Sequence, residues 1–187
     1  VSGFLLAGPF LGLIFYDLSR RLERNEPPTL SHALASLRDN PLAIILLIVM
    51  LGLILLAWIR VTSLITALSV AAVQPSLPVL IDTLLLTPEG LVFLGMFVLS
   101  GAVLAALTFC LSVVSFPMLL DRKVDTLTAV ATSVLVVRRN LPAMLVWAAL
   151  IAGLTLLGLL TLYLGLIVTM PLIGHAAWHA YRETVGA

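Results

Sequence analysis

No charged residue lies between Glu89 and Asp121, and this uncharged run at residues 90–120 limits the possible folds more than any other feature. A helix rises about 1.5 Å per residue, so about 20 apolar residues cross a hydrocarbon core about 30 Å thick. Similar runs occupy residues 42–59 and 141–174. The chain is 61% hydrophobic and only 10% charged, which is more apolar than a soluble surface tolerates. The sequence therefore predicts an all-α, polytopic membrane protein forming a single integral membrane domain.

About five transmembrane helices are predicted, at residues 1–16, 42–59, 90–117, 142–160 and 164–181. As one helix, residues 141–174 would be about 50 Å long, so we expect a turn near residues 161–163. Residues 30–40 and 121–140 are amphipathic and are predicted to form linker helices at the membrane surface. Residues 61–81 are uncharged but rich in hydroxyls and proline, which indicates an interfacial helix or a re-entrant segment, followed by a loop through Glu89.

The basic residues are distributed asymmetrically. Of the ten Lys and Arg residues, all but Arg60 fall in the linkers after the first and third predicted spans or after the last span. By the positive-inside rule, these linkers and the C-terminus are predicted to be cytoplasmic. The opening VSGFLL lacks a methionine and is already apolar, so we expect a fragment or processed product that begins inside its first membrane helix.

Two parts of the chain share an order of features, which suggests an internal repeat of residues 1–59 and 100–160. TLSHALASLRDNP, from Thr29, and TLTAVATSVLVVRRNLP, from Thr126, each follow a charged exit from an apolar run. Each has an amphipathic stretch, then asparagine, then proline at the start of the next span. Repeats of this kind occur in transporter scaffolds.

The last apolar run ends in MPLIGHAAWHAYRE, which holds the main candidates for a polar site. His175 and His179 are four residues apart, so they lie on one helix face and could share a metal ion. They cannot grip both sides of one haem iron, and no HExxH glutamate accompanies them. The alternative is that they lie at the membrane boundary with Trp178, Tyr181 and Arg182, as a cytoplasmic docking end. No catalytic residue or cofactor is predicted, although haem or metal at the histidines stays open.

Small residues with a spacing of four occur in three of the predicted spans. Such spacing lets two helix backbones approach closely, within the chain or with a partner protein. The pairs are Gly8 and Gly12, Gly101 and Ala105, and Ala149 and Gly153. No ionisable residue lies at the middle of a predicted span, which argues against an ion pathway. The sequence predicts no basic stripe on a soluble face, which argues against nucleic acid as a partner.

Three longer stretches resemble a known family: GPFLGLIFYDLSRRLE, FPMLLDRKVDTLTAVATSV and PLIGHAAWHAYRE. They are similar to bacterial predicted integral membrane proteins of the DUF2189 type, over nearly the whole chain, with the last stretch as the most specific part. The resemblance implies no established activity. Some members carry a label that links them to cytochrome c oxidase, but no copper or haem ligand set supports oxidase catalysis in this sequence.

The leading hypothesis is a non-catalytic subunit that packs against a larger, respiratory complex in a bacterial inner membrane. Its expected partners are the lipid bilayer and other membrane subunits. One alternative is a transporter or channel for a small neutral or apolar solute, which rests on the repeat. Another is a metal- or haem-binding membrane protein that uses His175 and His179.

Overall fold

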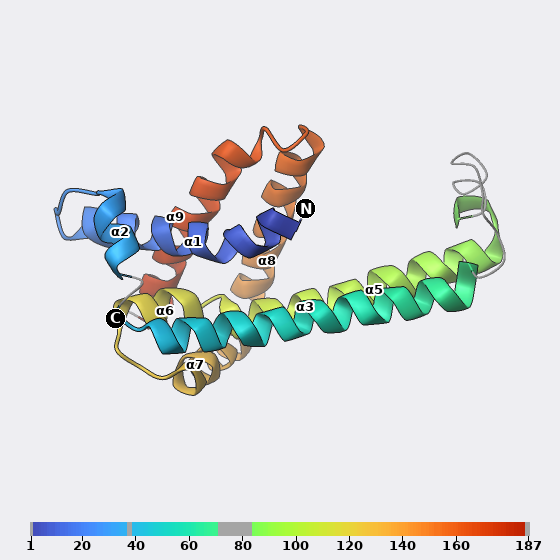
Figure 1. Ribbon diagram of the computed structural model, residues 1–187, viewed down its shortest axis with the longest axis horizontal. Coiled ribbons are helices and arrows are strands. Elements are labelled where there is room, and N and C mark those ends of the chain that lie inside the picture. Colours follow the sequence, from blue (N-terminus) through green and yellow to red (C-terminus); the bar gives the residue numbers. More distant parts are fainter. Residues whose placement is uncertain (1, 37–38, 71–83, 186–187) are drawn as a thin grey trace. The chain divides into compact units, whose positions relative to one another are not determined.

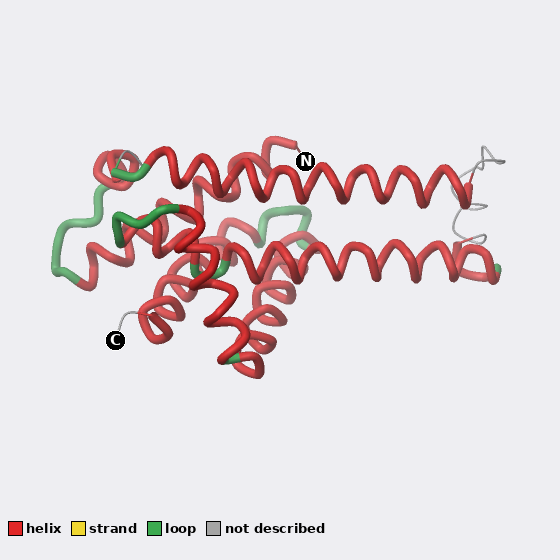
Figure 2. The backbone as a smooth tube through the Cα atoms, turned by 90° about the horizontal axis from the view of Figure 1, so that it is seen from below, coloured by secondary structure: helices red, strands yellow, loops and turns green. Residues whose placement is uncertain are grey.

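The structure, a computed structural model, describes residues 2–36, 39–70 and 84–185, and its long elements there are all helices (Figures 1 and 2). The helices are α1 Ser2–Glu23, α2 Leu30–Ser36, α3 Pro41–Val70, α5 Pro88–Ser112, α6 Ser115–Asp121, α7 Thr126–Arg139, α8 Leu141–Leu160 and α9 Leu166–Val185. The predicted all-helical class is confirmed. The predicted linker helices correspond to α2 and α7.

Three helical stretches are long and apolar enough to cross a membrane: Pro41–Leu68, Pro88–Asp121 and Leu141–Leu160. They correspond to the second, third and fourth predicted spans. The first and fifth predicted spans fall on the helices α1 and α9, which do not belong to this set as far as the described residues go. In α9, the charged last turn and the polar His175 and His179 lower the mean hydropathy.

The predicted second span, about residues 42–59, lies within a longer helix, because α3 continues through Arg60 to Val70. The hydroxyls that made residues 61–70 look too polar bond within the helix itself. Ser63 donates to the carbonyl of Ile59, and Thr66 donates to that of Thr62, each at 2.8 Å. Such hydroxyls need no partner outside the helix. The rest of the segment predicted as an interfacial helix or a re-entrant segment, residues 71–81, lies outside the described residues.

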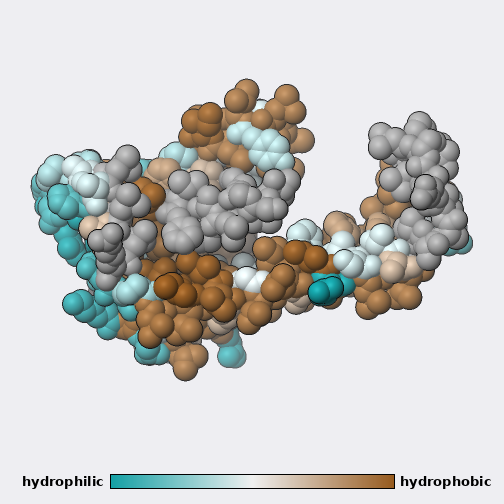
Figure 3. Space-filling model, viewed as in Figure 1, coloured by the Kyte–Doolittle hydropathy of each residue, from teal (hydrophilic) through white to brown (hydrophobic). Residues whose placement is uncertain are grey.

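The chain divides into two compact units, residues 1–48 with 109–187 (unit 1) and residues 49–108 (unit 2). In unit 2, α3 and α5 lie side by side, with the rings of Trp58 and Phe97 6.2 Å apart between centroids. In unit 1, α9 packs against α1 and α8, and α6 packs against α7 (Figure 1). Figure 3 shows hydrophilic residues gathered at the end of unit 1 that carries α2.

The third apolar stretch does not run as one helix to residue 117, as predicted, because α5 ends at Ser112 and α6 begins at Ser115. Ser133 of α7 holds this break. Its hydroxyl accepts from the backbone N–H of Val114 at 3.2 Å and donates to the carbonyl of Cys110 at 2.8 Å. Ser133 is fully buried, so a neighbouring helix supplies the partners that the interrupted helix lacks.

Replacing Ser133 with alanine is expected to lower the free energy of unfolding by about 1–3 kcal/mol, because a buried N–H and a buried carbonyl lose their partner. Thr132→Ala is the matched control on the same helix. Its hydroxyl bonds only to the carbonyl of Thr128, one turn earlier, so its loss should cost less than about 0.5 kcal/mol. Unfolding in mixed detergent micelles, followed by circular dichroism, measures both. Equal effects would contradict this role of Ser133.

The turn expected near residues 161–163 is present, because α8 ends at Leu160 and α9 begins at Leu166. Leu162 and Tyr163 have φ angles of 54° and 69°, which reverse the chain direction in the left-handed region. The Thr161 hydroxyl accepts from the N–H of Gly165 at 2.8 Å. This turn joins α8 and α9 as an antiparallel pair.

Candidate functional site

The polar groups of unit 1 concentrate where α1, the end of α6 and α9 meet. A close approach between α1 and α9 creates this junction. At Gly174, an added Cβ would lie 2.6 Å from the Cβ of Phe15, so only glycine fits there without a shift. Next to this contact, His175 lies 5.8 Å from the Phe15 ring between centroids. The Nδ1 atom of His175 shares a hydrogen bond with the Ser19 hydroxyl at 2.5 Å.

Between Phe15 and Ser19 on α1, Asp17 is completely buried and paired with two arginines of its own helix. Arg20 contacts one carboxylate oxygen, and the Nε of Arg21 donates to the other at 2.8 Å. Arg20 also donates to the carbonyl of Leu120 at 2.6 Å. The buried carboxylate therefore orients a guanidinium that ties α1 to the C-terminal end of α6.

Asp121, the last residue of α6, is the centre of a second group of charges. The Tyr181 hydroxyl donates to Oδ2 of Asp121 at 3.0 Å. Three arginines from different segments lie further out, with nitrogen–oxygen distances of 3.8 Å for Arg24, 3.8 Å for Arg122 and 3.9 Å for Arg182. We call these five residues the Asp121 cluster.

Glu23 links α1 to the exposed side of α9. Its carboxylate lies 3.5 Å from Nδ1 of His179 and 3.4 Å from Nε of Arg182. The side chains of His179 and Arg182 are 61% and 41% exposed, so water screens both contacts. The contacts of Glu23 with His179 and Arg182 therefore orient the end of α9 but add little to the stability of the fold.

A pKa shift occurs at the start of α7, outside the membrane-length stretches. The hydroxyl and backbone N–H of Thr128 both bond to Asp125 and lower the pKa of its carboxyl. Asp125 is thus a charged N-cap.

The structure divides the four residues of the predicted docking end into two pairs. Trp178 and Tyr181 are each 1% exposed and pack within the protein, with ring centroids 5.5 Å apart. His179 and Arg182 remain on the surface and contact Glu23. The end of α9 therefore packs against α1 and α6 of its own chain.

The two histidines considered as metal ligands contact different groups, since His175 contacts Ser19 and His179 contacts Glu23. Within the described part of the chain, no three His, Cys, Asp or Glu residues are grouped so as to hold a metal ion. The geometry offers orientation of helices and charge pairing in place of a coordination sphere.

The predicted small-residue pairs have different surroundings. Gly101 faces Nε1 of Trp58, 3.6 Å from an added Cβ, so it packs within unit 2, whereas Ala105 is exposed. Among the described residues, no atom lies within 4 Å of a Cβ added at Gly153, and both it and Ala149 are exposed on α8. The three described atoms nearest to a Cβ added at Gly12 belong to Tyr16 of the same helix. The surroundings of Gly8 lie outside what the structure describes.

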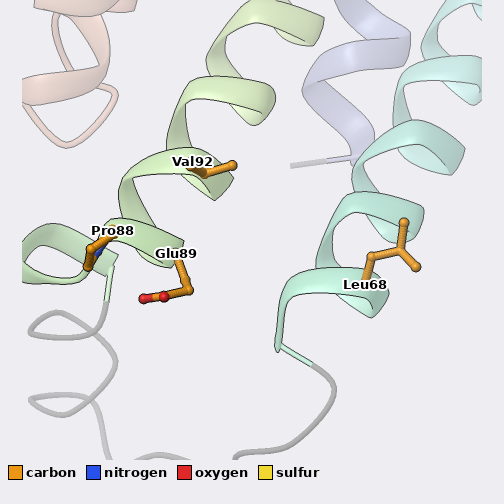
Figure 4. Close-up of a pocket in the computed structure, with 4 residues that line it drawn as sticks. All are labelled: Leu68, Pro88, Glu89 and Val92. Atoms are coloured by element: carbon orange, nitrogen blue, oxygen red, sulfur yellow. The ribbon is translucent and has the colours of Figure 1, made fainter.

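Two open pockets lie among the described residues. The one in unit 2 has a volume of about 360 Å³ and is lined by Leu68, Pro88, Glu89 and Val92, with Glu89 its one charged lining residue (Figure 4). The other, in unit 1, has about 440 Å³ and lies between the start of α3 and the start of α7. Across its floor, the Asn40 side chain donates to the carbonyl of Val124 at 2.8 Å. Neither lining contains a histidine or cysteine that could act beside a nucleophile.

Sequence reasoning missed the importance of Ser19, Gly174 and Ser133. The Asp17 pairing was foreseeable, because carboxylate and guanidinium groups three and four residues apart share a helix face. Nothing local marks Gly174 or Ser133, since each acts on a residue from a distant part of the chain. Only the tertiary contacts identify them.

The comparisons with known proteins agree with a helical membrane protein. No curated protein and no solved structure matches the chain. One family model does match, over residues 1–121, which is less than the nearly complete coverage expected, and the run PLIGHAAWHAYRE lies beyond the matched part. The matched part contains α1, α6 and two of the membrane-length stretches. The chain therefore belongs to the predicted integral membrane protein family DUF2189.

Proposed function

We propose that this protein is a non-catalytic, multi-pass subunit that packs through its membrane helices against another membrane protein. The observation that carries the proposal is the exposed face of α8 at Ala149 and Gly153, where no described atom lies within 4 Å of a Cβ added at Gly153. Lipid tails gain little from such a face, whereas a second helix can approach its backbone closely. The occupant we propose is a transmembrane helix of another subunit.

The polar groups of unit 1 support a scaffold role. The buried carboxylate of Asp17 and the hydroxyls of Ser19 and Tyr181 all bond within the chain. They hold helices together, and a group that acts on a substrate would need an open face. A respiratory complex is the assembly to examine first, because similar proteins carry a label linking them to cytochrome c oxidase.

The topology belongs to the same proposal. We take α1 and α9 as two further crossings, for five in all, because α9 runs from its turn back along α8 and packs against α1. The basic linkers and the C-terminus are then cytoplasmic, in a bacterial inner membrane. Reporter fusions after Val70 and at the C-terminus, which report on opposite sides of the membrane, test this arrangement.

Gly153→Leu is expected to remove a co-purifying membrane subunit, because the leucine side chain keeps the partner backbone at a distance. The matched control is Ala152→Leu, an equally exposed position about 100° around the same helix. The tagged protein is purified from its native membranes in mild detergent, and its partners are identified by mass spectrometry. A protein that runs alone, or a partner that survives Gly153→Leu, contradicts the proposal.

A transporter is the second candidate, favoured by one observation. The order of an apolar helix, an amphipathic helix, an asparagine and another apolar helix occurs at α1–α2–α3 and again at α5–α6–α7–α8. The two asparagines, Asn40 and Asn140, each stand directly before the second apolar helix. Solute uptake into vesicles that contain the purified protein alone would favour this candidate over the subunit.

A further inference from the structure

The Asp121 cluster brings three arginines to one carboxylate from three separate segments. Arg24 follows α1, Arg122 follows α6, and Arg182 lies in the last turn of α9. Their side chains are 56%, 44% and 41% exposed, whereas Asp121 is 10% exposed. The guanidinium groups therefore surround a nearly buried anion from the water-accessible side.

Asp121 does not use all the hydrogen-bond donors of these three arginines. Its nitrogen–oxygen distances to them, 3.8–3.9 Å, exceed a hydrogen bond, and Tyr181 supplies its one direct donor among the described side chains. Each guanidinium carries five N–H donors. Arg122 uses one on the carbonyl of Val185, and Arg182 lies beside Glu23. Three positive charges thus face two carboxylates, which leaves one excess positive charge and several free donors.

The position of the cluster along the chain selects its ligand. Asp121 is the last residue of the membrane-length stretch Pro88–Asp121, and Arg122 follows immediately. The end of an apolar span lies at the depth of the lipid headgroups, where basic side chains meet lipid phosphates. A phosphate group there would reach the arginines from their exposed side.

We propose that the Asp121 cluster binds the phosphate group of an anionic lipid headgroup. Guanidinium groups pair with phosphate oxygens through charge-assisted, often bidentate hydrogen bonds. The bound phosphate would bridge Arg24, Arg122 and Arg182, and so fix the ends of α1, α6 and α9 to one another at the membrane surface. This role does not depend on the partner subunit proposed above.

The test compares two double variants that remove equal charge. Arg24→Gln with Arg182→Gln is expected to weaken phosphatidylglycerol binding by about 100-fold, because the charge-assisted hydrogen bonds of each arginine to the phosphate contribute about tenfold in affinity. Arg138→Gln with Arg139→Gln is the control, because these exposed arginines end α7 beside another span but lie outside the cluster. We expect less than a threefold change for the control. Native mass spectrometry of the detergent-solubilised full chain measures lipid binding.

Titrations with phosphatidylcholine and with inorganic phosphate separate the possible ligands. Equal losses in the two double variants, or equal affinity for phosphatidylcholine, would show a diffuse surface charge effect and overturn the site. Inorganic phosphate that binds as tightly as phosphatidylglycerol would overturn the assignment to a lipid. Circular dichroism of each variant verifies that its helices are intact.

Asp121→Asn provides a test with the opposite sign, which misfolding cannot imitate. Asparagine keeps an acceptor for the Tyr181 hydroxyl but removes the negative charge, so the excess positive charge of the cluster rises. Phosphatidylglycerol should bind about threefold to fivefold more tightly. Unchanged or weaker binding would overturn the proposal.

Discussion

Asp17→Asn is expected to destabilise the protein by about 3–5 kcal/mol, because it leaves two guanidinium groups without their buried counter-charge. The carboxylate has no exposed surface, and the side chains of Arg20 and Arg21 are only 12% and 18% exposed. Asparagine has nearly the same size as aspartate, so the loss is one of charge and hydrogen bonding, with little change in packing. The free energy of unfolding in mixed detergent micelles, followed by circular dichroism, measures it.

The chain offers a matched control in Glu26. Its carboxylate contacts the same Arg21 side chain at 3.1 Å, but it is 47% exposed. Glu26→Gln is expected to cost less than about 1 kcal/mol, since water replaces an exposed ion pair. If Asp17→Asn is no more costly than Glu26→Gln, the buried pair does not hold α1 in place.

The consequence of Asp17→Asn should extend beyond α1. Arg20 contacts Asp17 and also donates to the carbonyl of Leu120, which directly precedes Asp121. We therefore expect Asp17 to act on the Asp121 cluster indirectly, as a residue that positions the end of α6. The buried carboxylate and the exposed arginines form one connected polar network between α1 and α6.

Much of the helical plan was predictable from hydropathy, because long uncharged runs have few alternatives in a membrane. The turn between α8 and α9 followed from length alone. The continuation of α3 past Arg60 did not, because a count of polar residues treats Ser63 and Thr66 as breaks when their hydroxyls in fact bond to their own helix.

The candidate site was less predictable than the helices. The sequence singled out the end of α9 correctly as polar, with Trp178 and Tyr181 among its candidates. It did not indicate that both are buried, because their partners come from α1 and α6. Ser19 and His175, for example, are 156 residues apart in the chain. Pairings at that separation depend on how helices pack, which periodicity along one helix does not encode.

Gly174→Val is expected to lower the free energy of unfolding by about 3 kcal/mol or more, through overpacking of the α1–α9 contact. Any Cβ at residue 174 meets the Cβ of Phe15 at 2.6 Å, and that atom is attached to the α1 backbone. A rotamer change of Phe15 therefore cannot relieve the clash, and the two helices must separate. Their separation would also lengthen the Ser19–His175 hydrogen bond.

Gly153→Ala is the control, because an added Cβ there meets no atom within 4 Å and alanine is the better helix former. It should leave the free energy of unfolding unchanged or raise it by up to about 1 kcal/mol. Gly174→Ala, a smaller insertion at the same contact, is expected to cost about 1–3 kcal/mol. Denaturation of all three variants under identical micelle conditions gives the comparison.

A double-mutant cycle shows whether the clash with Phe15 is the cause. Phe15→Gly removes the Cβ that Gly174→Ala would meet, so the two substitutions together should cost less than the sum of their separate costs, by about 1–2 kcal/mol. Additive costs would mean that Gly174 is needed for another reason, such as the bend at Pro171 one turn earlier in α9. A strong coupling would instead identify one backbone contact, Phe15 against Gly174, as the point from which the polar network of α1, α6 and α9 is aligned.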